Sequence, residues 1–94
     1  MADNNQDLQR RRDAAFARGL GNQLPVYVEK ARNAEIWDVE GRRYIDFGSG
    51  IAVLNTGHLH PKVRAAVAQQ LDAFSHTCLM VTPYGVAVEL AEKL

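Results

Sequence analysis

The chain has 94 residues, which suits one small domain or part of a larger one. Eleven basic and eleven acidic residues cancel, so the charge gives no footprint for nucleic acid or an anionic membrane. The longest apolar runs are about four residues, far short of the roughly 20 that span a bilayer. The start "MADNNQDLQRRRD" contains no apolar signal core and Cys78 has no second cysteine to pair with, so we expect a cytoplasmic protein.

The first predicted element is a polar helix over residues 4–18. The run Arg10–Arg12 could suggest a basic patch, but three charges do not make a tract, and a solvated helix face or a packing arm is favoured. Two glycines and a proline in "RGLGNQLP", residues 18–25, end the helix. The few apolar contacts of this helix are Leu8, Ala14, Ala15 and Phe16.

Three strand patterns follow and predict a small antiparallel meander over residues 26–47. Valines alternate with Tyr27 in "PVYVEKA", and apolar residues recur in "EIWDV" and "RRYIDF". The dipeptide Glu40-Gly41 lies between the last two patterns, and glycine tolerates the positive φ of a hairpin turn.

Two helices are predicted after the glycine-rich segment 48–57. The first begins at Pro61, because proline lacks an N–H that would have no partner in the first turn. The second begins near Thr82-Pro83, a side-chain cap before a proline, and runs to Leu94. No cap follows Leu94, so we expect the chain to be the front of a longer protein or a fragment of one. The apolar residues of the first helix have helical spacing: Val63, Val67, Leu71 and Phe74.

Histidines and the cysteine form two pairs, His58 with His60 and His76 with Cys78, that invite a metal-site interpretation. Residues two apart in an extended segment point to the same face, so each pair could bind a metal together. Zinc patterns favour two to four intervening residues, however, and His60 precedes Pro61 at a predicted helix cap. A capping histidine, a turn histidine and a buried thiol are favoured, and no metal ligand is predicted.

Three carboxylates could suggest acid–base catalysis: Asp38, Glu40 and Asp46. On a hairpin, however, we expect them on the wet face or at the turn. Gly48-Ser49-Gly50 is similar to a phosphate cradle but lacks the further glycines of a dinucleotide-binding turn. Close approach of the glycine backbone to a ligand or to another chain is the alternative.

The lysines lie among polar residues, so none is predicted to have the lowered pKa of a nucleophilic amine. They are Lys30, Lys62 and Lys93. The chain is therefore predicted to hold no catalytic lysine.

The stretch "RNAEIWDVEGRRYIDFGSGIAVLNTGHLHPKV", residues 32–63, resembles the N-terminal part of class III pyridoxal-phosphate aminotransferases. The nearest subgroup resembles the bacterial 4-aminobutyrate aminotransferases and their 5-aminovalerate-using relatives. Two motifs carry most of the resemblance: Trp-Asp-x-x-Gly-x-x-Tyr-x-Asp from Trp37 to Asp46, and Gly-Ile-x-x-x-x-x-Gly-His from Gly50 to His58. His60-Pro61, Ser75-His76-Thr77 and the arm "RRRDAAFARGLG" extend it over nearly the whole chain.

The resemblance implies an α+β segment, with an N-terminal helix, a small antiparallel meander and two helices, of an α/β fold-type-I transferase. Residues 1–24 would form a helical arm, residues 25–57 the meander and active-site loop of the small domain, and residues 58–94 helices leading into a large cofactor-binding domain. The parent would be a homodimer or higher homo-oligomer, with no nucleic-acid or membrane partner. It would transfer an amino group from an ω-amino acid, 4-aminobutyrate first, to 2-oxoglutarate through pyridoxal phosphate.

The resemblance also implies which residues bind substrate. The family residue that matches Ile51 lines the substrate pocket, and an apolar wall suits a methylene chain. The position that matches Met80 lies near the pocket from the partner subunit and often carries glutamine in relatives of the 4-aminobutyrate type, so methionine departs from that pattern. The cofactor-binding residues and the Schiff-base lysine lie later in family members, so we expect this chain alone to be inactive and to bind no cofactor.

Two alternatives stay open. The donor could be 5-aminovalerate, ornithine or acetylornithine. The chain could also be a non-catalytic binding or oligomerisation module built from the same segment.

Overall fold

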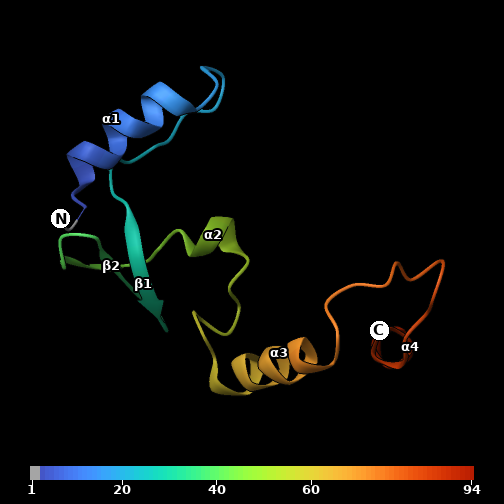
Figure 1. Ribbon diagram of the computed structural model, residues 1–94. Helices are drawn as coiled ribbons and strands as arrows, with labels where there is room; N and C mark the ends of the chain where they lie inside the picture. Colours follow the sequence, from blue (N-terminus) through green and yellow to red (C-terminus); the bar gives the residue numbers. More distant parts are fainter. Residues whose placement is uncertain (1–2) are drawn as a thin grey trace. The chain divides into compact units, whose positions relative to one another are not determined.

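The computed structural model describes residues 3–94, which divide into two compact units at the boundary between His60 and Pro61 (Figure 1). The order of elements confirms the predicted α+β segment, with an N-terminal helix, an antiparallel meander and two later helices. The first unit contains α1 (Asn5–Ala15), β1 (Val28–Arg32), β2 (Glu35–Asp38), β3 (Arg43–Ile45) and the short α2 (Ser49–Ala52). The second contains α3 (Pro61–Ala73) and α4 (Gly85–Lys93).

Helix α1 begins at a side-chain cap and ends earlier than predicted. The Asn4 side-chain oxygen accepts a hydrogen bond of 2.8 Å from the Asp7 N–H, which satisfies one of the first unpaired donors of the helix. Phe16 leaves the helix in an extended conformation, with φ −90° and ψ 152°. The helix therefore ends at Ala15 rather than at residue 18, and the centre of the Phe16 ring lies 5.1 Å from the Arg12 guanidinium carbon.

The three strands form an antiparallel sheet in the order β1-β2-β3, which confirms the meander. Gly41 in the β2–β3 turn has a φ of 80°, as the sequence predicts. Strand β1 begins at Val28, later than the predicted pattern, because the Tyr27 N–H donates to the Asn5 side-chain oxygen at 2.8 Å. A register irregularity between Val28 and Lys30 adds a local bulge.

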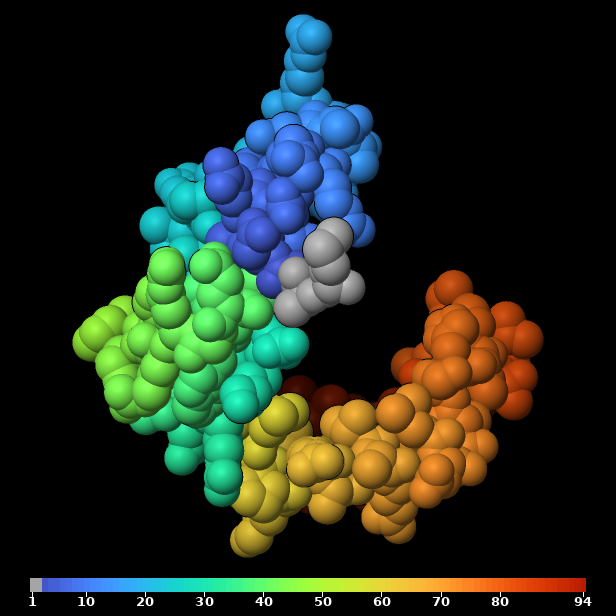
Figure 2. Space-filling model, turned by 60° about the vertical axis from the view of Figure 1, so that its left-hand side comes forward, coloured from blue at the N-terminus to red at the C-terminus, as the bar shows by residue number. Residues whose placement is uncertain are grey.

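Asn5 fastens α1 to the sheet. Its amide nitrogen donates to the Asp38 carboxylate at 2.9 Å, while its backbone N–H donates to the Glu40 carboxylate at 3.2 Å. In Figure 2 the blue atoms of the helix start lie next to the green atoms of the β2–β3 turn. The helical arm is therefore fixed to the sheet by polar contacts.

No apolar side chain among residues 3–94 is buried, and Asp38 is the fully buried side chain of this part of the chain. The apolar stripes of the later helices are uncovered, with about half or more of each side chain exposed. They comprise Val63, Val67 and Leu71 on α3, and Val86, Val88 and Leu90 on α4.

In the second unit, α3 begins at Pro61 as predicted, and its neighbour Phe74 packs edge-to-face on Tyr84 with ring centroids 5.4 Å apart. Helix α4 begins at Gly85, and the predicted threonine cap is wrong. Thr82 instead belongs to the preceding turn, because its N–H donates to the Cys78 carbonyl at 3.0 Å. Over residues 3–94, no helix has the length and apolar character needed to cross a membrane.

Candidate functional site

A left-handed turn lies inside segment 48–57 and is drawn as α2 in Figure 1. Helical hydrogen bonds of 2.9 Å close it, from the Ala52 N–H to the Gly48 carbonyl and from the Val53 N–H to the Ser49 carbonyl. Such backbone costs an L-residue roughly 1–2 kcal/mol and concentrates at functional sites. The turn is therefore the candidate functional segment. Its four consecutive positive φ angles are 48° at Ser49, 61° at Gly50, 66° at Ile51 and 59° at Ala52.

Ile51 stands at the exposed face of this turn. Its side chain is 93% exposed, although a β-branched residue at φ 66° and ψ 57° is strongly disfavoured. The side chain makes almost no contact within the chain, so its apolar surface is open to a ligand or to another protein surface. That Ile51 lines a substrate pocket stays a prediction.

Asp46 and His58 join the two ends of segment 48–57. One Asp46 carboxylate oxygen accepts from the Gly48 and Ser49 N–H groups, both at 3.0 Å, and the other lies 2.6 Å from His58 Nε2. The His58 backbone exchanges two hydrogen bonds of 2.9 Å with Asn33, at the turn between β1 and β2. Sequence reasoning missed this pair, because no spacing rule connects residues twelve apart across a loop.

The environment of Asp46 contradicts its expected place on the wet face. Its side chain is 14% exposed and that of His58 is 21% exposed. The hydrogen bond from His58 is the largest cause that lowers the pKa of Asp46 below its ordinary value of 3.8, and the Ser49 N–H adds to it. The carboxylate is thus held ionised, and an ionised carboxylate only accepts, so His58 Nε2 carries the shared hydrogen.

Asp38 is not on the wet face but lies at the β2–β3 turn, the other place expected for it: its carbonyl accepts from the Gly41 N–H at 3.0 Å. It is fully buried, and it accepts four hydrogen bonds of 2.9 Å, from the Asn5 amide, the Tyr44 hydroxyl and the backbone N–H groups of Glu40 and Arg42. Burial alone would raise the pKa of Asp38, but these hydrogen bonds outweigh it, so the pKa lies below its ordinary 3.8. Asp38 therefore has an organising role in the fold, while Glu40 lies exposed at the turn as predicted.

Met80 lies in the second unit, in a turn before α4. The Cys78 carbonyl accepts from the Val81 N–H at 2.8 Å, and the Thr77 hydroxyl donates to the Thr82 carbonyl at 2.8 Å, so the turn is closed on both sides. Cys78 has a φ of 57°, and the Met80 side chain is 93% exposed. A role for Met80 beside substrate stays a prediction.

The histidines and Cys78 form no metal site within the described part of the chain. Among residues 3–94, no group of three or more His, Cys, Asp or Glu side chains could hold a metal ion. His58 is engaged with Asp46 instead.

The described residues do not fit pyridoxal phosphate. The Gly48 and Ser49 N–H groups already donate to Asp46, so Gly48-Ser49-Gly50 does not present them to a phosphate. Lys30 is exposed, with its ammonium 5.2 Å from the centre of the Trp37 ring, and Lys93 is exposed in the last turn of α4. Neither lysine has the desolvated surroundings of a reactive amine.

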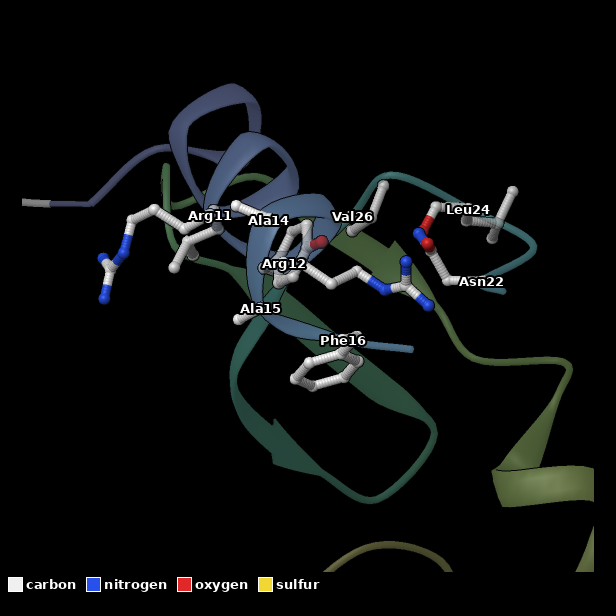
Figure 3. A pocket seen from close by; sticks show the side chains of 10 residues that line it. Arg11, Arg12, Ala14, Ala15, Phe16, Asn22, Leu24 and Val26 are labelled. Atoms are coloured by element: carbon white, nitrogen blue, oxygen red, sulfur yellow. The ribbon is translucent and has the colours of Figure 1, made fainter. Parts of the chain in front are cut away.

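The hollows of the first unit include one beside α1 and one beside the left-handed turn. A groove of about 640 Å³ lies between α1 and residues 22–27 (Figure 3), and Ile51 does not line it. A second hollow of about 480 Å³ lies beside the left-handed turn and is lined by Asp46, Ser49 and Leu54 among others.

Known proteins match this chain over most or all of its length. A family model described as aminotransferase class-III matches residues 15–94. The 5-aminovalerate aminotransferase of Pseudomonas aeruginosa is 57% identical over 94 residues, which are 100% of this chain and 22% of that protein. The 4-aminobutyrate aminotransferase of Escherichia coli is 54% identical over 88 residues, 94% of this chain and 21% of that protein.

Solved structures agree with these relatives. A Bacillus anthracis aminotransferase has a TM-score of 0.75 at 26% identity and covers 94% of this chain, which matches 20% of that structure. The acetylornithine aminotransferase of Elizabethkingia anophelis has a TM-score of 0.69 at 30% identity, with 82% of this chain and 22% of that structure covered. The chain spans about a fifth of the length of the curated relatives it matches.

Proposed function

Because the chain belongs to the class-III aminotransferase family, we propose that it forms the N-terminal part of an aminotransferase that acts on an ω-amino acid. The amino group passes to 2-oxoglutarate and yields glutamate. The donor proposed first is 4-aminobutyrate.

The observation that carries this proposal is high identity along the chain to enzymes named for ω-amino acids. Both relatives, at 57% and 54% identity, are named for unbranched donors. The exposed Ile51 side chain supports the same donor class, because a methylene chain gains free energy on an apolar surface. The 57% identity to a 5-aminovalerate aminotransferase makes 5-aminovalerate the second candidate donor.

The cofactor and the partners belong to the proposal for the whole protein. Pyridoxal phosphate would supply the electron sink for amino transfer and would be held by residues outside this chain. Within residues 3–94, Ile51 would orient the donor's methylene chain and exclude water from one side of it. We further propose a cytoplasmic homodimer or higher homo-oligomer, with Met80 near the pocket of the partner subunit.

Amino transfer by the intact gene product tests the proposal. The purified protein is incubated with 2-oxoglutarate and either 4-aminobutyrate or 5-aminovalerate, and glutamate is measured by mass spectrometry. We expect glutamate with both donors. Absence of glutamate with either donor would favour the non-catalytic module or another donor such as ornithine.

Ile51→Gln tests the pocket wall. We expect the selectivity for 4-aminobutyrate over glutamate, as a ratio of kcat/KM values, to fall about tenfold, which is the discrimination that a methylene contact supplies. Val53→Gln is the matched control, since Val53 is 68% exposed in the same segment but lies outside the left-handed turn. An unchanged ratio in Ile51→Gln would remove Ile51 from the pocket.

A further inference from the structure

We propose that Asp46 and His58 are positioning residues, which hold the left-handed turn so that Ile51 meets the donor's methylene chain. This inference rests on the proposed function, because the role of Ile51 toward a donor is part of it. Neither residue needs to touch the substrate. Their action passes through the backbone of segment 48–57.

Asp46 holds the entrance of segment 48–57. The Asp46 carboxylate holds the Gly48 and Ser49 N–H groups on one oxygen, both at 3.0 Å. These two residues lead directly into the left-handed turn. The Asp46 N–H in turn donates to the Ala34 carbonyl at 2.8 Å, which fixes Asp46 on the turn between β1 and β2.

His58 holds the exit of segment 48–57. His58 is fixed on the same turn between β1 and β2, through its reciprocal backbone bonds with Asn33. Its ring then reaches back to the free oxygen of Asp46 at 2.6 Å. A hydrogen bond to an ionised carboxylate is roughly twice as strong as a neutral one. Asp46 and His58 therefore close the segment at its base.

Apolar packing does not keep the turn left-handed, since its apolar side chains are exposed: Ile51 is 93% exposed, and Phe47, two residues before the turn, is 94% exposed. Three non-glycine residues of the turn, Ser49, Ile51 and Ala52, carry the conformational cost. Within the described residues, the contacts at the base of the segment act beside the two closing hydrogen bonds of the turn and are placed to offset that cost.

An ordinary structural ion pair would predict a loss of stability alone. A positioning pair predicts more: weaker donor binding with little change in kcat, because the chemistry is carried out elsewhere in the protein. The sheet offers a matched comparison in Asp38. This second aspartate has more hydrogen-bond partners than Asp46, yet it contacts α1 and the β2–β3 turn and not segment 48–57.

The test uses the intact gene product and the variants Asp46→Ala, His58→Ala and Asp46→Asn, with Asp38→Asn as control. We expect Asp46→Ala and His58→Ala to raise the KM for 4-aminobutyrate about tenfold while kcat changes less than about twofold. Asp46→Asn keeps an acceptor for the Gly48 and Ser49 N–H groups but sets an amide NH2 against the His58 Nε2–H, so it should recover only part of the loss. Asp38→Asn should lower the melting temperature and leave KM unchanged.

Hydrogen exchange gives a readout that does not need activity. The Ala52 and Val53 amides report the turn, because they donate its closing hydrogen bonds. Their exchange should quicken about tenfold in Asp46→Ala, and stay within about twofold of wild type in Asp38→Asn. Hydrogen exchange therefore tests whether Asp46 holds the turn even in a variant that is inactive for another reason.

The outcomes separate the two proposals. Wild-type protein without amino transfer overturns the proposed function, and the exchange rates then still decide whether Asp46 and His58 hold the turn. Active wild type with unchanged KM in both alanine variants overturns the positioning role. So does equal quickening of Ala52 and Val53 exchange in Asp38→Asn, since the effect would then be general destabilisation.

Discussion

Ile51→Gly should make the protein more stable and a poorer catalyst at the same time. Ile51 is a β-branched residue in left-handed backbone, and its side chain is 93% exposed. A residue selected for stability would not be isoleucine at this position. If the Ile51 side chain contacts a ligand, removing it should raise the stability of the protein and lower its catalytic efficiency.

The size of the stability change follows from three terms. Glycine removes a left-handed strain of about 1.5 kcal/mol and loses about 0.75 kcal/mol through the greater freedom of the unfolded chain. With 93% of the side chain exposed, the lost burial costs only about 0.2 kcal/mol. The net result is a gain of about 0.5 kcal/mol. Catalysis moves in the opposite direction: loss of contact with about two methylenes lowers kcat/KM for 4-aminobutyrate about tenfold.

The assay compares wild type, Ile51→Gly and Ala52→Gly in the intact protein, by urea unfolding and by steady-state kinetics. Ala52 has a φ of 59° in the same turn, so its replacement by glycine relieves comparable strain without removing the apolar side chain. Both variants should gain stability, and only Ile51→Gly should lose kcat/KM. A destabilised Ile51→Gly would refute the strain estimate, and an unaltered kcat/KM would refute the role of Ile51 as a pocket wall.

Two further perturbations test the hydrogen-bond framework. The pKa values of Asp38 and Asp46 lie below their ordinary 3.8, so the folded state binds fewer protons than the unfolded state. The stability that these two carboxylates contribute is complete above pH 3.8 and is lost as the pH falls through their lowered pKa values. The urea midpoint should therefore drop on acidification below pH 3.8, and an equally steep drop in the double variant Asp38→Asn/Asp46→Asn would contradict this origin. Gly57→Ala should destabilise by about 1–2 kcal/mol in the same assay, because its Cβ would lie 3.1 Å from the Asn33 backbone at a φ of 80°. Gly21→Ala has open space around it and should be neutral, and equal effects of the two would show that the contact with Asn33 is unimportant.

Elements whose cause is local are predictable from the sequence. Pro61 at the start of α3 and Gly41 in the β2–β3 turn are correct because each residue's own backbone preference decides the structure there. The ends of the helices are less predictable. Helix α1 ends early because Phe16 becomes extended, and α4 begins late because Thr82 is engaged in the turn before it.

The candidate site was only partly predictable, because its contacts are long-range. The glycines around Ile51 indicated an unusual segment, but no propensity places isoleucine and alanine in left-handed backbone. The bond between Asn5 and Asp38 joins residues 33 apart, and that between Asp46 and His58 joins residues 12 apart. Polar residues with such partners are indistinguishable in the sequence from solvated ones, which is why the sequence predicts both aspartates on the wet face or at the turn and not in buried networks.

The two aspartates explain how a unit without buried apolar side chains among residues 3–60 can present a strained turn in a fixed place. Apolar contacts have no preferred direction, and a loop held by them alone could relax to right-handed backbone. Hydrogen bonds are directional, and each carboxylate here accepts from several donors of different segments. Asp38 fixes the arm and the β2–β3 turn, while Asp46 fixes the entrance and exit of segment 48–57. The exposed apolar residues are thereby left to contact other surfaces, and a ligand's methylene chain at Ile51 would be one such surface.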